Sequence, residues 1–362
     1  YWPIRTRCRP PFPLKPAGRS VLQSQRPPRG SKEGEFAMPN RCSVHILALI
    51  LIAFVSHPAL AFQDRPHPQT WYVAVDGDNG GSGSQSDPFA TIQYAIDAAA
   101  DGDTVLVGNG RYTGPGNRDI EFLGKAILVA SATEDPSQCV IDCQGSLEEP
   151  HRGFWFKSAD DTTSVLRGFR ITRGYATDFG GGLLLDISEG YNAASPKLEE
   201  CRVDSCTAPY GAGIACITGD NWDVYSRARL IDCDVTDNMG EGIVWTAMGR
   251  SLFQRCGISR NQTEGIFFDG GYGQDFGIYD CDLNDNGGTG ILINSRMNDN
   301  AELVNSRVLR NDNWGIDAVG YNEGCGLRRG GWEMSEFKGR QLVAVFDLNK
   351  CLECHTCTVA CK

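Results

Sequence analysis

The feature that most constrains this chain is a repeat that runs from about Phe169 to Val319. Each repeat opens on one residue and later carries a glycine followed by an aliphatic residue. The opening residues are Phe169, Cys201, Cys233, Cys256, Cys281 and Ser306, and the glycines are Gly182, Gly213, Gly242, Gly265, Gly290 and Gly315. From Cys233 onward the period is 23, 25 and 25 residues. Short alternating apolar segments at this period, without helical spacing, predict a solenoid of stacked strands.

One asparagine stands five residues after each opening residue in the later repeats. These residues are Asn238, Asn261, Asn286 and Asn311. If the rungs stack at about 4.8 Å, the asparagines lie above one another at a turn. Each side-chain amide can then bond to the next, as in other stacked β structures. The sequence therefore predicts an asparagine ladder.

In the regular repeats the alternation of residues along a strand predicts that Cys233 and Val235 point to one face and Asp232 and Asp234 to the other. The opening cysteines are therefore expected to form a buried column. They are Cys201, Cys233, Cys256 and Cys281. In-register neighbours keep their Cβ atoms about 4.8 Å apart, whereas a disulfide needs about 3.8 Å. We therefore expect inert core thiols along the column. Disulfides between Cys139 and Cys143, or between Cys206 and Cys216, stay open as alternatives.

The rungs resemble the right-handed parallel β-helix family, the pectate-lyase-like superfamily, over residues 70 to 320. The resemblance implies an all-β solenoid, and a lyase in this superfamily would use calcium-binding aspartates and a basic proton acceptor. Asp232, Arg255 and Asp280 form a loosely similar outward column and are the catalytic candidates. Two rungs separate the aspartates by about 9.6 Å, near the upper end of the carboxylate spacing of inverting glycosidases. The alternative is an exterior ladder of alternating charge that keeps the surface soluble.

Two neighbouring repeats carry longer loops than the others. The next opening residue follows 18 residues after Leu183 and 19 after Ile214, against 13 to 15 in later repeats. The acids and aromatics of these loops are the candidate sugar-binding residues: Asp186, Glu189, Tyr191, Asp220, Trp222 and Tyr225. Long loops on one face of a solenoid often form its binding face, although these aromatics could instead pack against the stack. The predicted function is a carbohydrate-binding or surface module, with a polysaccharide lyase or glycoside hydrolase as the alternative.

The N-terminal part is predicted to contain a leader, a signal peptide and a cap. Residues 1–37 are rich in proline and arginine and are expected to be a disordered or non-native leader. Residues 38–61 read as a signal peptide, too short to span a membrane, which predicts a secreted or periplasmic β-helix with no membrane span after cleavage. Residues 62–103 are expected to be the cap of the solenoid at 104–319. Their short helix is predicted to start at Asp87-Pro88 and to cover the first rung.

Charge and a short acidic loop bear on the partners. Lys plus Arg number 34 against 45 for Asp plus Glu, a net charge of −11, which argues against nucleic acid as a partner. Asp76 and Asp78 stand at alternate positions of a glycine-rich loop and could hold calcium through oxygen ligands. A solvated turn is the alternative that we favour, because no glutamate stands at the twelfth position.

A different pattern follows the repeat. Residues 320–333 read as a linker, and residues 334–362 end in C-x2-C-x2-C-x3-C, formed by Cys351, Cys354, Cys357 and Cys361. This spacing is typical of [4Fe-4S] ferredoxins; a disulfide knot is the alternative. The segment resembles the start of the iron-sulfur electron-transfer subunit of molybdenum oxidoreductases, which implies a redox partner subunit. We also expect residues 1–333 and 334–362 to be a chimera of two unrelated proteins.

Overall fold

The computed structural model describes most of the solenoid. The described residues are 68–157, 160–187, 194–218, 225–247, 249–297, 302–318, 346–347 and 357–359. All of them belong to one compact unit, Asp64–Lys362. The predicted leader and signal peptide, at 1–37 and 38–61, lie outside the described residues, as does the linker at 320–333.

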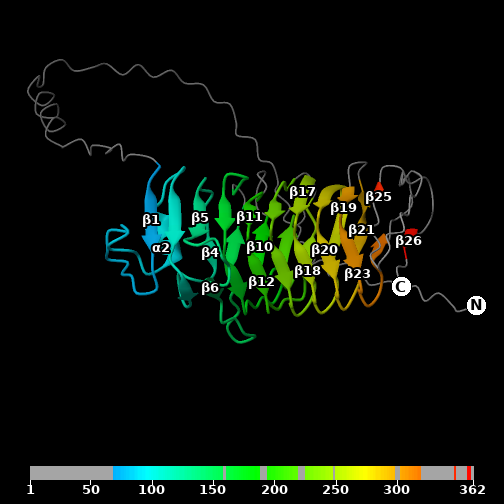
Figure 1. Ribbon diagram of the computed structural model, residues 1–362, viewed down its shortest axis with the longest axis horizontal. Coiled ribbons are helices and arrows are strands. Elements are labelled where there is room, and N and C mark those ends of the chain that lie inside the picture. The colour runs from blue at the N-terminus through cyan, green and yellow to red at the C-terminus, as the bar shows by residue number, and fades with distance from the viewer. Residues whose placement is uncertain are drawn as a thin grey trace, which may run out of the picture. The chain divides into compact units, whose positions relative to one another are not determined.

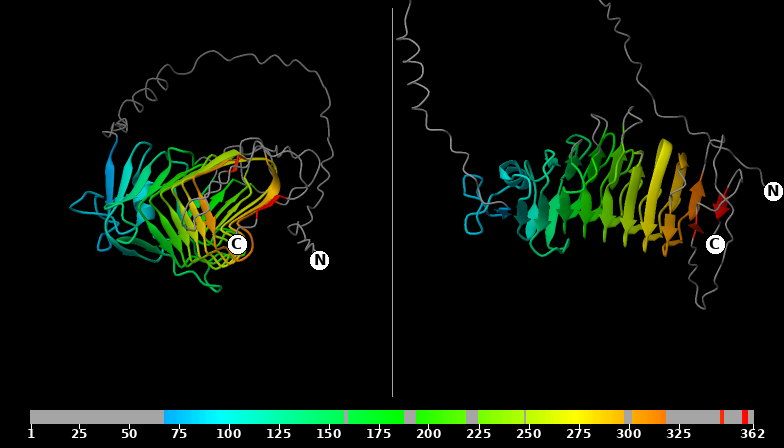
Figure 2. Two further views of the ribbon diagram at one scale, coloured as in Figure 1. Left: turned by 45° about the vertical axis from the view of Figure 1, so that its right-hand side comes forward. Right: turned by 90° about the horizontal axis from the view of Figure 1, so that it is seen from above.

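The chain winds into a coil whose rungs each contribute strands to three rows of parallel strands (Figure 1, Figure 2). Row 1 contains β1 (Thr70–Val73), β2 (Thr104–Val107), β5 (Leu128–Ser131), β8 (Val165–Arg167), β11 (Lys197–Glu199), β14 (Arg229–Ile231), β17 (Gly249–Gln254) and β22 (Glu302–Val304). Row 2 contains β3 (Gly110–Tyr112), β6 (Cys139–Asp142), β9 (Arg170–Thr172), β12 (Arg202–Asp204), β15 (Asp234–Thr236), β18 (Gly257–Ser259), β20 (Asp282–Asn284) and β23 (Arg307–Leu309). Row 3 contains β4 (Ile120–Glu121), β7 (Phe154–Phe156), β10 (Leu183–Asp186), β13 (Ile214–Ile217), β16 (Ile243–Trp245), β21 (Ile291–Met297) and β24 (Ile316–Ala318).

One long strand, β19 (Ile266–Tyr279), belongs to two rows. Its first residues pair with β16 and β21 of row 3, and its last residues pair with β17 and β22 of row 1. Rows 1 and 3 therefore join into one 18-stranded sheet, while row 2 stays a separate 8-stranded sheet. The predicted all-β solenoid is confirmed by this parallel, in-register pairing.

The asparagine ladder is confirmed. Asn238 donates from Nδ2 to Oδ1 of Asn261 at 3.0 Å, Asn261 does the same to Asn286 at 3.0 Å, and Asn286 to Asn311 at 2.9 Å. Each Nδ2 also donates to a backbone carbonyl in the row 2 strand of the preceding rung, as Asn261 does to Val235 at 3.0 Å. The ladder thus satisfies buried turn groups that no strand pairing reaches.

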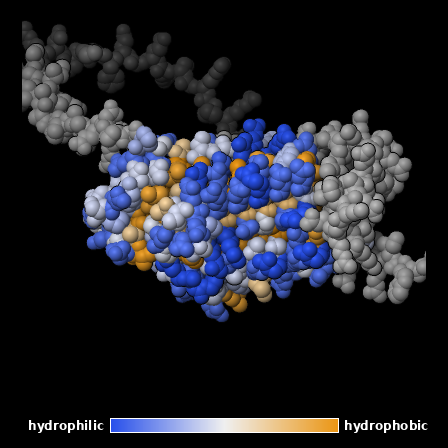
Figure 3. Space-filling view, in the orientation of Figure 1, coloured by the Kyte–Doolittle hydropathy of each residue, from blue (hydrophilic) through white to orange (hydrophobic). Residues whose placement is uncertain are grey.

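The cysteine column is confirmed as well. Cys201, Cys233, Cys256 and Cys281 are at most 3% exposed and are free thiols. Cys139, Cys143, Cys206 and Cys216 are also buried and free, so neither of the two open disulfide alternatives forms. The core around the column is aliphatic and aromatic, and the face seen in Figure 3 is mostly hydrophilic.

The helix near the start of the coil differs from the prediction. It is α2 (Ile92–Ala98), its N-cap is Thr91, and it buries Ile92, Ala95 and Ile96. Asp87 does not cap it, because Phe89 pairs with Val73 of β1 in extended conformation. The Asp87 carboxylate instead accepts a hydrogen bond from the Ser82 N–H at 2.7 Å. That the helix covers the first rung stays a prediction. Among the described residues no helix is long and apolar enough to cross a membrane.

Two short strands follow the coil in the sequence. β25 (Phe346–Asp347) pairs antiparallel with β22, and β26 (Cys357–Val359) pairs antiparallel with β24. Both come from the segment that carries the C-terminal cysteine motif, so the backbone of Cys357 lies opposite Ala318 of the last described rung.

Candidate functional site

The predicted catalytic residues stand at a corner of the coil, between rows 1 and 2. Asp232, Arg255 and Asp280 have φ of 54°, 52° and 55°, in the left-handed region. Glu200 and Asn305 hold the same place in neighbouring rungs, with φ of 52° and 50°. From β8 onward, one left-handed residue directly follows each row 1 strand and starts the chain toward row 2. Polar residues such as aspartate and asparagine tolerate this conformation better than β-branched ones.

This corner corrects the predicted geometry of the site. The alternation of faces was expected to carry Asp232 and Asp234 together on one strand, opposite Cys233. In the structure β14 ends at Ile231 and β15 begins at Asp234, so Asp232 belongs to the turn. The corner residues still form a column, because the backbone N–H of each donates to a carbonyl of the next rung. Asp232 N–H donates to Gln254 O at 2.9 Å, and Arg255 N–H donates to Tyr279 O at 2.9 Å.

Within the column, Arg255 and Asp232 form a bidentate ion pair. Arg255 donates from Nε and Nη2 to the two carboxylate oxygens of Asp232, at 2.6 and 2.5 Å. These bonds hold the pKa of Asp232 below its usual range. Asp280 is exposed one rung further on. Both oxygens of Asp232 are thus occupied, and the pair is open to solvent, which fits an exterior charge ladder at least as well as a proton-transfer site.

Two of the predicted sugar-binding residues, Asp186 and Tyr225, are described, and both stand at the corner between rows 3 and 1. Asp186 ends β10 and is half-buried, and Tyr225 is 53% exposed in the following loop. Glu189, Tyr191, Asp220 and Trp222 lie outside the described residues. The two loops span 187–196 and 218–228 and connect β10 to β11 and β13 to β14. The loops therefore leave consecutive rungs at the same corner, as their lengths predicted.

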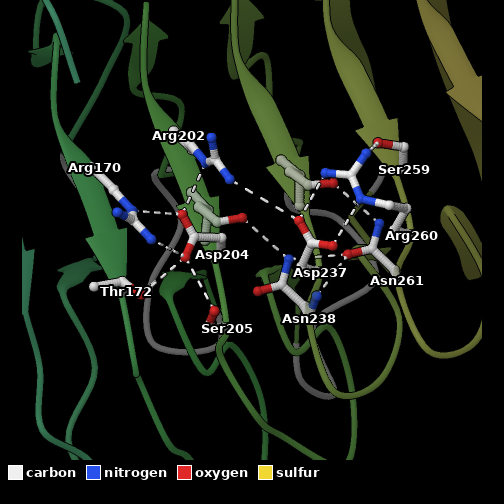
Figure 4. Close-up of polar contacts among 12 residues, drawn as sticks. Arg170, Thr172, Arg202, Asp204, Ser205, Asp237, Asn238, Ser259, Arg260 and Asn261 are labelled. Atoms are coloured by element: carbon white, nitrogen blue, oxygen red, sulfur yellow. Dashed lines mark hydrogen bonds and ion pairs between the residues drawn. The ribbon is translucent and has the colours of Figure 1, made fainter. Parts of the chain in front are cut away.

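Sequence reasoning missed a second polar cluster, on the outer face of row 2. Asp142 and Asp204 are almost fully buried there. Figure 4 shows Asp204 in contact with Arg170 of the preceding rung and with Arg202 of its own strand. Arg170 donates to both oxygens of Asp204 at 2.7 and 2.9 Å, and Arg202 donates to one at 2.9 Å. These hydrogen bonds outweigh the opposing effect of burial and lower the pKa of Asp204. The available signal was the set of outward residues between Arg111 and Asp204, most of which lie in rungs where the repeat is less regular.

The predicted metal sites are not formed by the described residues. No group of three histidine, cysteine, aspartate or glutamate side chains able to hold a metal ion occurs among them. In the acidic loop, Asp78 Oδ1 accepts the Gly80 N–H at 2.9 Å, as a solvated turn does. Cys351, Cys354 and Cys361 lie outside the described residues, and of Cys357 only the backbone is described.

Comparisons with known proteins agree with the fold. The family model described as "Right handed beta helix region" matches residues 191–329. Pectate lyase Pel9A is 18% identical with a TM-score of 0.41, covering 69% of this chain and 78% of that chain. A rhamnogalacturonan lyase is 15% identical with a TM-score of 0.43, covering 62% and 61%. Because likenesses this distant carry no information on activity, the conclusion is limited to a right-handed parallel β-helix.

One curated protein shares a short segment with this chain. The selenate reductase subunit beta of Thauera selenatis is 78% identical over 23 residues. The match covers 6% of this chain and 7% of the length of that subunit. The likeness therefore concerns a segment and not a whole protein.

Proposed function

We propose that the β-helix is a non-catalytic glycan-binding module. Its contact surface is the corner formed by loops 187–196 and 218–228. The observation that carries this proposal is the exposure of Tyr225, 53%, in the long loop 218–228. This loop leaves the coil at the same corner as the long loop 187–196 of the preceding rung. A flat aromatic side chain suits a sugar ring, and a carboxylate at the same corner, such as that of Asp186, suits its hydroxyl groups.

The bidentate ion pair of Arg255 and Asp232, at the corner between rows 1 and 2, supports binding rather than catalysis. A general base needs a free acceptor within hydrogen-bond reach of the substrate. Asp232 has both oxygens bonded to Arg255, so a substrate proton would have to compete with the guanidinium for them. The lyase or hydrolase alternative would require this pair to open.

A glycan array on the intact chain tests the proposal. We expect binding to a subset of polysaccharides, weakened about tenfold or more by Tyr225→Ala. Trp314→Ala is the matched control, because Trp314 is an exposed aromatic, at 40%, in the turn between rows 2 and 3. Absence of any glycan above background, or equal losses in both variants, would refute the proposed surface.

For residues 334–362 we propose a separate role, electron transfer through a [4Fe-4S] cluster. Four thiolates at the ferredoxin spacing, from Cys351, Cys354, Cys357 and Cys361, are the donor set that such a cluster takes. When bound, the cluster would supply one-electron transfer to a partner subunit. The short likeness to the selenate reductase subunit supports this role.

Reconstitution with iron and sulfide tests the cluster. In the ferredoxin run the fourth cysteine ligates a second cluster, so we expect a labile, substoichiometric cluster held by Cys351, Cys354 and Cys357. Cys354→Ser should abolish it. A stable four-iron cluster formed quantitatively would contradict the further proposal that residues 1–333 and 334–362 derive from two unrelated proteins, and so would a single transcript with an intact mass that includes both parts.

A further inference from the structure

We propose that the N-terminal end of the row 2 face binds sulfated polysaccharides. The surface, here named the arginine strip, consists of the outward side chains of Arg111, Arg170, Arg173 and Arg202. It lies on a different row from the proposed glycan corner between rows 3 and 1, so this inference does not depend on that corner.

The strip presents cations outward and keeps its anions beneath. Its four guanidinium groups contact two buried carboxylates, those of Asp142 and Asp204. The side chains of these aspartates are 1% and 2% exposed, whereas the arginines above them are 34% to 56% exposed. Arg202 Nη2 also lies 4.0 Å from the half-exposed carboxylate of Asp237, which Arg260 holds at 2.8 Å, and Asp234 is the register partner of Arg202. With Arg260 included, five arginines face four carboxylates, so one positive charge is in excess. On a chain with net charge −11, this strip is a local attraction for anions.

The arginines keep donors available for a ligand. Arg111 engages Asp142 through Nη1 alone, at 2.6 Å, and Arg202 engages Asp204 through Nε, at 2.9 Å. Within the described part of the chain, their other guanidinium N–H groups form no hydrogen bond. Asp142 is also held by Arg173 through Nε at 2.8 Å, and Asp204 by Arg170. The exposed donors of Arg111 and Arg202 can thus turn to a ligand without leaving either carboxylate unpaired.

The spacing of the strip favours a sulfate ester. Arg170 and Arg202 are register partners on adjacent strands, about 4.8 Å apart along the coil. Because Arg170 already donates from Nε and Nη2 to both oxygens of Asp204, a ligand carboxylate cannot form the same two-bond contact with this arginine. A sulfate ester shares one negative charge among three terminal oxygens, which can accept hydrogen bonds from arginines of two rungs at once. Arginines repeated along the axis suit a linear polymer with several such groups.

The same row contains its own control. Toward the C-terminal end the arginines and aspartates pair one to one: Arg310 with Asp285 at 2.6 Å, and Arg307 with Asp282. No positive charge is left over in these described pairs. The inference therefore predicts binding at one end of the row and not at the other.

Heparin binding by the full chain tests the inference, measured by calorimetry beside polygalacturonate and dextran. We expect heparin to bind tightest, with an affinity that falls as salt rises. Arg111→Gln/Arg202→Gln should weaken it about tenfold and flatten its salt dependence, while Arg307→Gln/Arg310→Gln should not. Tyr225→Ala should leave heparin binding unchanged, which separates this surface from the proposed glycan corner.

Three results would overturn the inference. They are heparin binding no tighter than dextran, polygalacturonate binding as tight as heparin, and equal losses in the two arginine pairs. Thermal unfolding of each variant verifies folding. If the glutamine variant does not fold, Arg111→Lys/Arg202→Lys replaces it. This variant keeps the charge but loses the guanidinium donors, and is expected to bind with intermediate affinity; unchanged affinity would count against the inference.

Discussion

Arg255 donates through Nε and Nη2 to both carboxylate oxygens of Asp232, on the neighbouring rung, at 2.6 and 2.5 Å. Both residues adopt left-handed backbone conformations at the same corner of the coil. Parallel stacking in register brings equivalent corner residues of successive rungs together. The charges of the corner residues in successive rungs therefore determine whether neighbouring side chains attract or repel each other.

The first prediction concerns this pair. In Arg255→Gln the pKa of Asp232 should rise toward its ordinary value, because the hydrogen bonds and charge that lower it are lost. The fold should persist, since both side chains are about half exposed. Carboxyl carbon NMR across pH 2 to 6 measures the change. An unchanged pKa would mean that the pair does not form in solution.

The second prediction concerns the asparagine ladder. Asn261→Ala removes two bonds that its amide donates, to Val235 O and Asn286 Oδ1, and two that it accepts from Asn238. The buried partners are left unpaired, so the free energy of unfolding should fall by about 3 kcal/mol. Asn311→Ala, at the half-buried end of the ladder, should cost about 1 kcal/mol. Urea denaturation gives both values, and equal losses would argue against a cooperative ladder.

The third prediction concerns the repeated glycines. A Cβ on Gly242 would lie 2.6 Å from Asn261 Nδ2 and 2.7 Å from Gly265 O, whereas on Gly315 the nearest atom is 3.6 Å away. Gly242→Ala should therefore destabilise the coil by about 1–3 kcal/mol through overpacking, and Gly315→Ala should be nearly neutral. Thermal and chemical unfolding distinguish them. A neutral Gly242→Ala would show that the rungs are less closely stacked than described.

The fourth prediction concerns the buried thiols. Burial raises the pKa of Cys139 and of Cys206 to about 12. A raised native pKa favours the protonated form, so this contribution to stability is complete below the unfolded value, near 9, and is lost as pH rises toward 12. Each thiol adds a loss of about 1.4 kcal/mol per pH unit in that window.

Alkylation followed by peptide mass spectrometry measures these thiols. The native chain at pH 8 should leave the peptides of Cys139, Cys206 and the cysteine column unmodified, and denaturant should expose all of them. Rapid native alkylation would contradict their burial. A disulfide between Cys233 and Cys256 would contradict the in-register stack.

The features that the sequence predicted well are those that repeat. Asparagines equivalent to Asn261 and cysteines equivalent to Cys256 stand at the same position in successive repeats. Stacking places such equivalent residues of neighbouring rungs in contact. The corner at Asp232 was not predicted, because a one-residue left-handed turn leaves the alternation of buried residues almost intact. Cys233 and Val235 stay buried, as expected, although the strand has already ended at Ile231.

Two further differences have other causes. Asp87-Pro88 has the sequence of a helix start, but Phe89 pairs with β1. The helix therefore begins only at Ile92. The arginine strip was missed because Arg111 and Arg173 lie in early rungs whose period is irregular. Their common partner, Asp142, is identified only when strands 30 residues apart are aligned in space.

The most direct test of the central claim, that the β-helix binds glycans without cleaving them, is to follow binding and turnover on the same polysaccharide. The intact chain is incubated with each array hit, and both the dissociation constant and the release of reducing or unsaturated ends are recorded. We predict saturable binding that Tyr225→Ala weakens, with no new chain ends over a day. Depolymerisation that disappears in Asp280→Asn would contradict the claim and assign the corner of Asp232, Arg255 and Asp280 a catalytic role.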